Sequence, residues 1–164
     1  MRLLSLKAMR TLIVYISYHH GNTEVIAGAM REVLEAELRS PESTTPEHIK
    51  SFDLIGFGSG NYFGKFDKRL VSLIDGLPRG TDKDAFIFST SGSGVYEDAH
   101  RELRKRLADK GFRVVGEWHC KALDTYGPLR LMGGLNKGKP DAKDIEAAKS
   151  FAARLKMASS SKAA

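Results

Sequence analysis

Short segments of strand character alternate along this chain with longer segments of helical period, and this alternation constrains the fold more than any single motif. The expected strands cover residues 11–16, 36–39, 53–58, 85–89 and 112–120. The first has no polar alternation, which is typical of a strand buried on both faces of a parallel sheet; the second is short and polar, which suits a sheet edge. Because parallel strands are joined by right-handed crossovers, the chain is predicted to form a doubly wound α/β domain.

The expected helices present apolar side chains at intervals of three and four residues. These are Ile26, Met30 and Leu34, then Leu70, Ile74 and Leu77, then Leu103 and Leu107, and finally Ile145, Ala148, Ala152 and Leu155. A helix over about 96–109 should end at Gly111, and Asp141 should cap the last helix. In doubly wound sheets ligands bind beyond the carboxyl ends of the strands, so the loops that follow the strands are where function is expected.

The length of 164 residues suits one domain, predicted over residues 11–157 between an N-terminal tail of residues 1–10 and a disordered C-terminal tail of residues 158–164. No apolar run approaches the roughly 20 residues that span a bilayer, so no membrane segment is expected. Cys120 is the only cysteine. It excludes an intramolecular disulfide and a thiolate metal cluster, and it suits a reducing cytoplasm.

Basic residues outnumber acidic ones, 26 against 20, for a formal net charge of +6. Because they are dispersed along the chain, no nucleic-acid partner is expected. The densest set is interpreted as the solvated face of one helix, with an acidic partner as the alternative: Arg101, Arg104, Lys105, Arg106 and Lys110.

The first loop, residues 16–24, leads from the first strand into a helix with the sequence Ile-Ser-Tyr-His-His-Gly-Asn-Thr-Glu. The first amides of a helix lack internal partners and the helix dipole adds positive charge there, so this junction suits a phosphate. Gly21 permits close backbone approach, and Ser17, Tyr18 and Thr23 carry hydroxyl groups. Since the loop contains no Lys or Arg, backbone amides and hydroxyls would hold the phosphate. An ordinary helix cap is the alternative.

The second loop, residues 58–65, combines three glycines with two large aromatic residues. This combination suits a flat aromatic ligand that Tyr62 or Phe63 would cover; the alternative is a turn whose aromatic side chains pack on the core. A Walker loop is excluded because Phe66 stands where its Ser or Thr would bind magnesium. A dinucleotide fingerprint is excluded because the first strand-to-helix junction has one glycine instead of three.

The third loop, residues 89–96, offers many amide and hydroxyl groups for the polar edge of a ring system, and Tyr96 is a second candidate for stacking. A flexible linker would have a similar composition. The fourth loop, residues 121–139, is long for a connection, which favours a rim above the site or a docking surface for a partner.

Three reactive side chains near these loops are interpreted conservatively. His19 and His20 have no acidic cluster or third ligand nearby in the sequence, so they are expected to contribute backbone groups and not a general base or a metal site. Cys120 is interpreted as a packed thiol. No catalytic residue and no metal site are therefore predicted.

With these loops the chain resembles the flavodoxin family over about residues 11–155. The segment Tyr18-His19-His20-Gly21-Asn22-Thr23 matches the family's phosphate loop, although His19 and His20 stand where hydroxyl residues are usual. Residues 58–65 and 89–92 occupy the positions of the family's two flavin-ring loops.

The resemblance implies a flavodoxin-like doubly wound three-layer sandwich with a five-stranded parallel sheet in the order 2-1-3-4-5, and one noncovalently bound FMN. The residues implied to bind FMN are Tyr18, His19, His20, Gly21, Asn22, Thr23, Ser59, Gly60, Asn61, Tyr62, Phe63, Gly64, Thr90, Ser91, Gly92, Ser93, Gly94 and Tyr96.

The function that the resemblance implies is electron transfer between partner oxidoreductases through the flavin, as a carrier and not a stand-alone enzyme. Most flavodoxins are acidic whereas this chain is basic, so acidic docking surfaces on the partners are expected. The alternative on the same fold is an FMN-dependent NAD(P)H:quinone or flavin reductase. A phosphorylatable receiver domain is disfavoured because Gly56-Phe57-Gly58 ends the third strand where an acceptor Asp would be expected.

Overall fold

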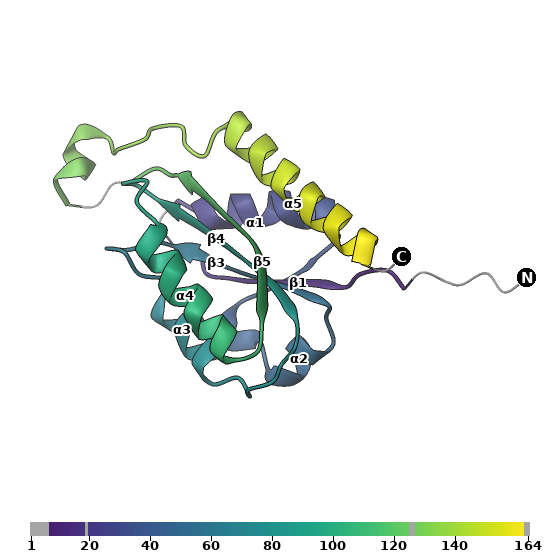
Figure 1. The fold of residues 1–164 in the computed structure, drawn as a ribbon. Coiled ribbons are helices and arrows are strands. Elements are labelled where there is room, and N and C mark those ends of the chain that lie inside the picture. The colour runs from purple at the N-terminus through teal and green to yellow at the C-terminus, as the bar shows by residue number, and fades with distance from the viewer. Residues whose placement is uncertain (1–6, 19, 125–126, 163–164) are drawn as a thin grey trace, which may run out of the picture.

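A computed structural model of the chain describes residues 7–18, 20–124 and 127–162 (Figure 1). Its five strands are β1 (Thr11–Tyr15), β2 (Glu37–Arg39), β3 (Leu54–Gly60), β4 (Asp84–Ser91) and β5 (Arg113–Lys121). All neighbouring strands are parallel, and the sheet order is β2-β1-β3-β4-β5. The predicted doubly wound fold and its strand order are confirmed.

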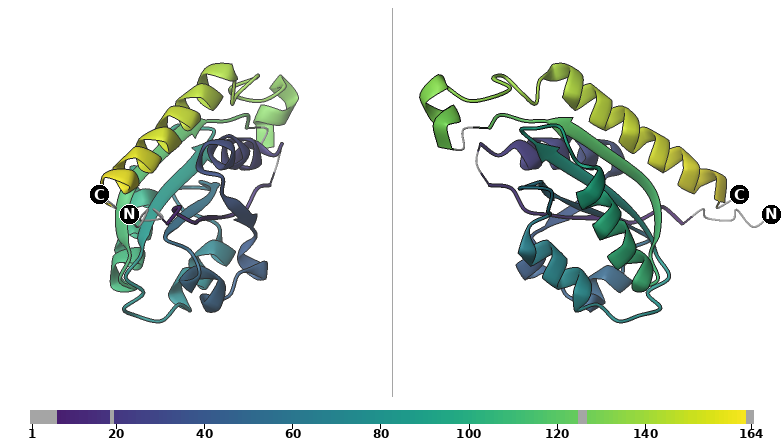
Figure 2. Two further views of the ribbon diagram at one scale, coloured as in Figure 1. Left: turned by 90° about the vertical axis from the view of Figure 1, so that its right-hand side faces the viewer. Right: turned by 60° about the vertical axis from the view of Figure 1, so that its left-hand side comes forward.

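Helices cover both faces of the sheet and complete the three layers (Figures 1 and 2). One face is covered by α1 (Asn22–Leu34) and α5 (Ala142–Lys162), and the other by α2 (Pro46–Lys50), α3 (Lys68–Asp75) and α4 (Glu97–Asp109). The first strand shows why both layers are needed, because successive side chains of a strand point to opposite faces. Leu12 and Val14 are fully buried on the α3 and α4 side, while Ile13 is fully buried on the α1 and α5 side.

Two glycines of β3 allow large aromatic side chains of β4 to pack across the sheet. A Cβ atom on Gly56 would lie 2.3 Å from the ring of Phe86, and one on Gly58 would lie 2.1 Å from the ring of Phe88. These contacts are too short for any side chain, so Gly56 and Gly58 are required for core packing. The glycine that opens the second loop therefore serves the core and not a ligand.

The carboxyl ends of the central strands extend further than the sequence pattern predicts. In β3 and β4, Ser59 pairs with Ser89 and Gly60 pairs with Thr90. Ser59, Gly60 and Thr90 therefore lie in strands although the sequence pattern places them in loops. Apolar periodicity missed these pairs because their side chains are small or polar. The ladder fixes the backbone of both loops at the edge where a ligand would bind.

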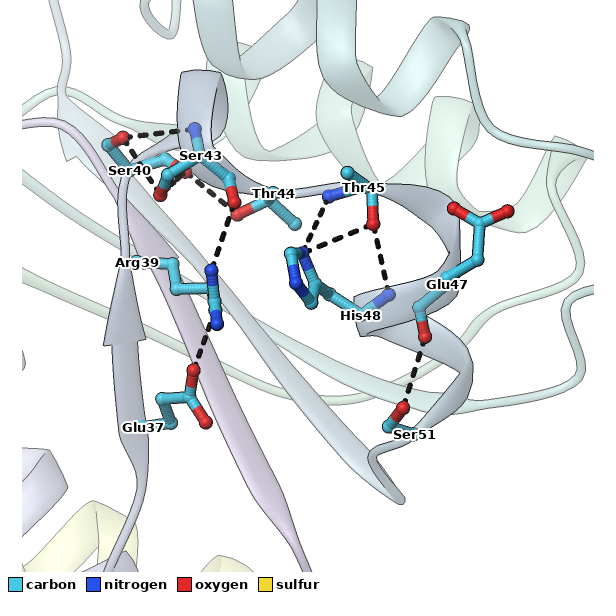
Figure 3. A network of polar contacts seen from close by, with 9 residues as sticks. All are labelled: Glu37, Arg39, Ser40, Ser43, Thr44, Thr45, Glu47, His48 and Ser51. Atoms are coloured by element: carbon cyan, nitrogen blue, oxygen red, sulfur yellow. Dashed lines mark hydrogen bonds and ion pairs between the residues drawn. The ribbon is translucent and has the colours of Figure 1, made fainter.

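The connection between β2 and β3 contains two short helical elements that the sequence pattern did not predict, η1 (Pro41–Ser43) and α2 (Figure 3). Polar side chains cap both: Ser40 Oγ accepts a hydrogen bond from the amide of Ser43 at 3.2 Å, and Thr45 forms a reciprocal capping box with His48. A helix of five residues is too short to show a helical period, which explains the omission.

Helix ends agree with the predicted caps, but the last helix is longer than expected. Gly111 follows α4 with a φ of +91°. Asp141 immediately precedes α5, and its Oδ1 accepts a hydrogen bond of 3.0 Å from the amide of Asp144 in the first turn. Helix α5 continues to Lys162 and so crosses the expected boundary at residue 157. Among the side chains whose burial the structure describes, Leu155 is the last buried one of this helix.

Candidate functional site

The first three loops meet at the carboxyl edge of the sheet, where the ends of β1, β3 and β4 lie side by side. The hydroxyl oxygens of Thr23 and Thr90 are 3.0 Å apart, which joins the first loop to the third. The amide of Asn61 donates to the carbonyl of Thr90 at 2.8 Å, and its side chain donates to the carbonyl of Val95 at 2.8 Å. Residues from all three predicted loops are therefore brought together.

The first loop ends with two residues in the left-handed conformation. His20 has a φ of +68° and Gly21 a φ of +64°, after which α1 begins at Asn22. The amide of Glu24 in the first helical turn donates to Ser17 Oγ at 3.1 Å. The loop thus presents the start of a 13-residue helix at the edge of the sheet, where the dipole and the first amides favour an anion. His19 lies outside the described residues.

Two predicted phosphate-binding side chains are already engaged within the protein. Thr23 is 2% exposed and faces Thr90, and Asn22 donates from Nδ2 to the carbonyl of Leu123 at 3.1 Å. One of the two hydroxyl groups of Thr23 and Thr90 donates its hydrogen to the other, so the second hydroxyl hydrogen can be donated to a ligand. The Asn22 amide group instead ties the first loop to the fourth.

Arginine side chains approach the first loop from other parts of the chain, although the loop contains none. The guanidinium of Arg69 lies 4.5 Å from the centre of the Tyr18 ring, and a cavity of about 310 Å³ beside Tyr18 is also lined by Arg39. Arg69 is paired with Glu42 at 3.1 Å and with Asp67 at 3.3 Å, so its charge is partly balanced. The inference that Lys and Arg are absent holds for the loop sequence but not for its surroundings.

The second loop forms a tight turn between Tyr62 and Lys65. Their backbone groups exchange two hydrogen bonds of 2.9 and 3.1 Å, and the central residues Phe63 and Gly64 have φ values of +51° and +78°. Two positive φ values are the signature of a type I′ turn. The turn holds the Phe63 side chain 86% exposed at the edge of the site. Such exposure of a Phe is compatible with covering a flat ligand.

Tyr62 points back toward the strand that precedes the loop. A Cβ atom on Gly60 would lie 2.7 Å from the Tyr62 ring, so Gly60 makes room for this ring. Burial raises the pKa of the Tyr62 hydroxyl. Of the two aromatic candidates in this loop, Tyr62 therefore packs on the backbone of the loop and Phe63 projects from it.

Asn61 carries a polar atom that fits a ligand donor. Its side chain is 9% exposed, and no residue within the described part of the chain donates a hydrogen bond to Asn61 Oδ1. A buried acceptor without a partner costs free energy, about 1–3 kcal/mol for a typical polar group. The Nδ2 atom fixes the orientation of this amide, so Oδ1 is held in place at the site.

The third loop is organised by its own serine side chains. Ser91 Oγ accepts from the amide of Gly94 at 3.1 Å, and Ser93 Oγ accepts from the amide of Val95 at 3.2 Å. The carbonyl of Gly92 accepts from Asn136 Nδ2 of the fourth loop at 2.7 Å. These hydrogen bonds define a specific turn, in contrast to the flexible linker that the composition alone would allow.

Tyr96 stacks on a histidine that the sequence did not identify. Its ring lies 4.4 Å from that of His119, at an interplanar angle of 18°. His119 belongs to a group that we call the histidine cluster: Ser89, Ser91, His100, Glu117 and His119. No motif marks this group, because its members come from β4, α4 and β5. The only signal in the sequence is the pair of serines at the end of the otherwise apolar strand β4.

Burial shapes the ionisation of the histidine cluster and of the neighbouring thiol. It lowers the pKa of His100 to about 4 and also lowers the pKa of His119, so both rings are neutral near pH 7. Cys120 faces the opposite side of the sheet, among the residues under α1 and α5. Burial raises the pKa of its thiol to about 12, which supports the interpretation of Cys120 as a packed residue.

The fourth loop is attached to the site at its base. Asp124 and Leu135 form an isolated antiparallel bridge, and Asn136 also donates to the carbonyl of Ala122 at 3.1 Å. Between these points, η2 (Gly127–Met132) projects beyond the sheet (Figures 1 and 2). Leu131 and Met132 on it are 93% and 75% exposed. The loop therefore forms a projecting rim next to the third loop.

Among residues 7–18, 20–124 and 127–162, no three His, Cys, Asp or Glu side chains are grouped so that they could hold a metal ion. Nor is any helix in this part of the chain long and apolar enough to cross a membrane.

Solved structures of flavodoxins share this architecture. Oxidised Flavodoxin 2 from Bacillus cereus matches with a TM-score of 0.68 and 20% identity, over 92% of this chain and 99% of that one. A flavodoxin from the domain Archaea matches with a TM-score of 0.61 and 19% identity, over 91% and 97% of the two chains. A flavodoxin, WrbA-like protein from Agrobacterium tumefaciens matches with a TM-score of 0.63 and 20% identity, over 92% and 96%.

The sheet order, the three layers and these matches show that the chain has the flavodoxin-like α/β fold. No model of a protein family matches the sequence. The chain is also 46% identical over 145 residues to the uncharacterized protein MJ0298 of Methanocaldococcus jannaschii, covering 88% of this chain and 96% of that protein, so the two are members of one sequence family.

Proposed function

We propose that this protein binds one FMN at the carboxyl edge of its sheet and transfers electrons between partner oxidoreductases. The observation that carries the proposal is the convergence of the first three loops, with a helix start at one end and an exposed aromatic residue at the other. The solved flavodoxins that share the fold support the same assignment.

The residues present fit the two ends of FMN. The phosphate would be held at the start of α1 by backbone amides from Gly21 onward and by the hydroxyl pair of Thr23 and Thr90. The ring would lie between the second and third loops, where Asn61 Oδ1 offers a fixed acceptor for an N–H group and Phe63 offers a stacking surface.

When bound, FMN would supply the redox chemistry, and the protein would supply binding, orientation and access. The turn at Phe63 and the rim at Leu131 are exposed, so the ring edge would be open to large partners. A net charge of +6 favours partners with acidic docking surfaces. We expect the protein to act in the cytoplasm.

A single reduction experiment separates this proposal from a reductase on the same fold. Flavin-free protein is reconstituted with FMN, and NADH or NADPH is added alone under anaerobic conditions. A carrier should keep its oxidised flavin spectrum until a partner reductase is added. Rapid bleaching of the bound flavin by NAD(P)H alone would instead assign the reductase activity, and a protein that never takes up FMN would refute both.

A further inference from the structure

The histidine cluster forms a continuous chain of side-chain contacts behind the third loop. From the loop inward, Ser91 Oγ lies 3.4 Å from His119 Nε2, and His119 Nδ1 lies 3.0 Å from Ser89 Oγ. Ser89 Oγ lies 2.7 Å from His100 Nε2, and His100 Nδ1 lies 3.2 Å from Glu117 Oε1. The chain thus connects the predicted ring-binding loop to a carboxylate on β5.

The two ends of this chain differ in their exposure. Ser89 is fully buried, and His100 and Ser91 are 2% and 6% exposed. The Glu117 side chain is 29% exposed and is paired with Arg104, itself 48% exposed, at 3.5 Å. Glu117 therefore reaches solvent on the α4 side, while Ser91 belongs to the site.

Proton placement in the chain follows from its outer end. A carboxylate only accepts, so His100 Nδ1 must carry a hydrogen and His100 Nε2 must accept from the Ser89 hydroxyl. The Ser89 oxygen then accepts from His119 Nδ1–H, which leaves His119 Nε2 to accept from the Ser91 hydroxyl. Ser91 Oγ in turn accepts from the amide of Gly94. Every hydrogen bond in the chain consequently points from the site toward Glu117.

The surroundings keep both rings neutral: His100 is buried and His119 is half-buried. The ring of Tyr96 stacks on His119, and the ring of Phe66 lies 5.4 Å from that of His100. Burial is the largest effect and lowers the pKa of both rings. His119 and Arg104 lower the pKa of His100 further, and Glu97 acts in the opposite direction on both rings. Neutral rings that each hold one hydrogen can pass a proton on without trapping it.

We propose that the histidine cluster is a proton relay between the site and solvent, with Ser91 at the inner end and Glu117 at the outer end. The relay rests on the proposed function, since oxidation of a reduced flavin releases a proton that a docked partner would confine.

The relay moves one proton along the chain without leaving a charge inside. Ser91 Oγ takes a proton from the site as its own hydrogen passes to His119 Nε2. The Nδ1 hydrogen of His119 passes to Ser89, the Ser89 hydrogen passes to His100 Nε2, and the Nδ1 hydrogen of His100 passes to the Glu117 carboxylate. Glu117 then releases that proton to water. Each step forms one N–H or O–H bond as another breaks, and no electrons are transferred within the chain.

The first test uses flavin-free protein and is independent of cofactor binding. Long-range ¹H–¹⁵N spectra at pH 7 distinguish the two tautomers of a neutral imidazole from the cation. Both His100 and His119 should be neutral with the hydrogen on Nδ1. A cationic ring, or a hydrogen on Nε2 of either residue, would overturn the relay because its hydrogen bonds would not share one direction.

The second test uses FMN-loaded protein and measures protons and electrons separately. Reduced protein is mixed with ferricyanide, which accepts electrons without protons, in weak buffer with a pH indicator. Ser89→Ala breaks the chain in the core and Glu117→Gln removes its partly exposed acceptor. Both should slow proton release about tenfold or more while leaving the rate of flavin oxidation unchanged.

Thr11→Val is the control, because it removes a buried hydroxyl that neither accepts nor donates a hydrogen bond among the described residues. It should leave proton release as fast as in the wild type. Equal proton release in all four proteins would overturn the relay. Failure to bind FMN would overturn the proposed function and the inner end of the relay, whereas the tautomers of the two histidines would still decide whether the oriented chain exists.

Discussion

The first loop and the histidine cluster lie at the same edge of the sheet but are built in opposite ways. The first loop is one continuous segment whose conformation depends on its backbone, with positive φ values at His20 and Gly21. The histidine cluster joins buried and partly buried side chains from three elements that are distant in sequence. The first can bind through repeated backbone groups, whereas the second depends on each side chain and its protonation state.

The two regions should therefore differ in their sensitivity to mutation and pH. A binding loop made of amides tolerates changes in side chains that do not touch the ligand. A buried polar network does not, because removing one member leaves another without a partner. Substitutions in the two regions should therefore separate ligand binding from pH-dependent stability.

The largest expected effect is on pH-dependent stability and concerns His100. Its pKa falls from 6.5 to about 4 on burial, so the unfolded chain binds more protons as the pH drops through this interval. The ionisation of His100 therefore leaves the free energy of unfolding unchanged above about pH 6.5. Between pH 6.5 and 4 it lowers the free energy of unfolding progressively, by about 3 kcal/mol in total. Urea denaturation of the wild type and of His100→Gln at a series of pH values would measure it.

The informative quantity in that experiment is the difference in pH dependence between the two proteins. The substitution is expected to lower stability at pH 7, because Glu117 and Ser89 lose their partner, but to flatten the profile between pH 6.5 and 4. Parallel profiles would show that His100 is not the source of the acid sensitivity.

The next largest effect distinguishes the two buried threonines and sharpens the assignment of the first loop. Thr23 and Thr11 are each 2% exposed, but only Thr23 lies at the proposed phosphate. Thr23→Val should weaken FMN binding about 30-fold, as expected for loss of about 2 kcal/mol from one hydrogen bond to a charged group. Thr11→Val should leave the FMN dissociation constant unchanged. Fluorescence titration would measure both dissociation constants. An equal loss of FMN affinity in the two variants would indicate a general loss of packing.

The smallest effect concerns the ring end of the site. Phe63→Ser should weaken FMN binding about fivefold through loss of stacking worth about 1 kcal/mol, without changing the stability of the flavin-free protein. Leu131→Ser is the matched control, because Leu131 is also strongly exposed, at 93%, but lies on the rim formed by the fourth loop. If both substitutions had the same effect on FMN affinity, the ring would not lie preferentially against the second loop.

The parts of the fold that could be predicted are those whose sequence pattern lies within one continuous segment. The alternation of strands and helices and the caps at Gly111 and Asp141 follow from patterns within single segments. The strand order was implied only by the resemblance to flavodoxins. The short helix α2 escaped because five residues carry no measurable period. The extension of β3 and β4 to Gly60 and Ser91 escaped because small polar residues at strand ends resemble loops.

Part of the candidate site was predictable for the same reason. The first three loops are continuous in sequence and were found from glycine, hydroxyl and aromatic residues at strand ends. The proximity of Arg69 to Tyr18 was not, because 51 positions separate them and only packing brings them within 4.5 Å. The stacking of Tyr96 on His119 likewise depends on the pairing of β4 with β5. Contacts between elements need the register of the sheet, which no local pattern contains.

The most direct measurement is a comparison of FMN with riboflavin, which has the same ring system but lacks the phosphate. Flavin-free protein should bind FMN with a stoichiometry of one, and riboflavin at least about 100-fold more weakly, because only FMN engages the start of α1 and the Thr23 and Thr90 hydroxyls. Equal affinities for the two flavins would contradict the role assigned to the first loop, and no binding of either would contradict the account of the site as a whole.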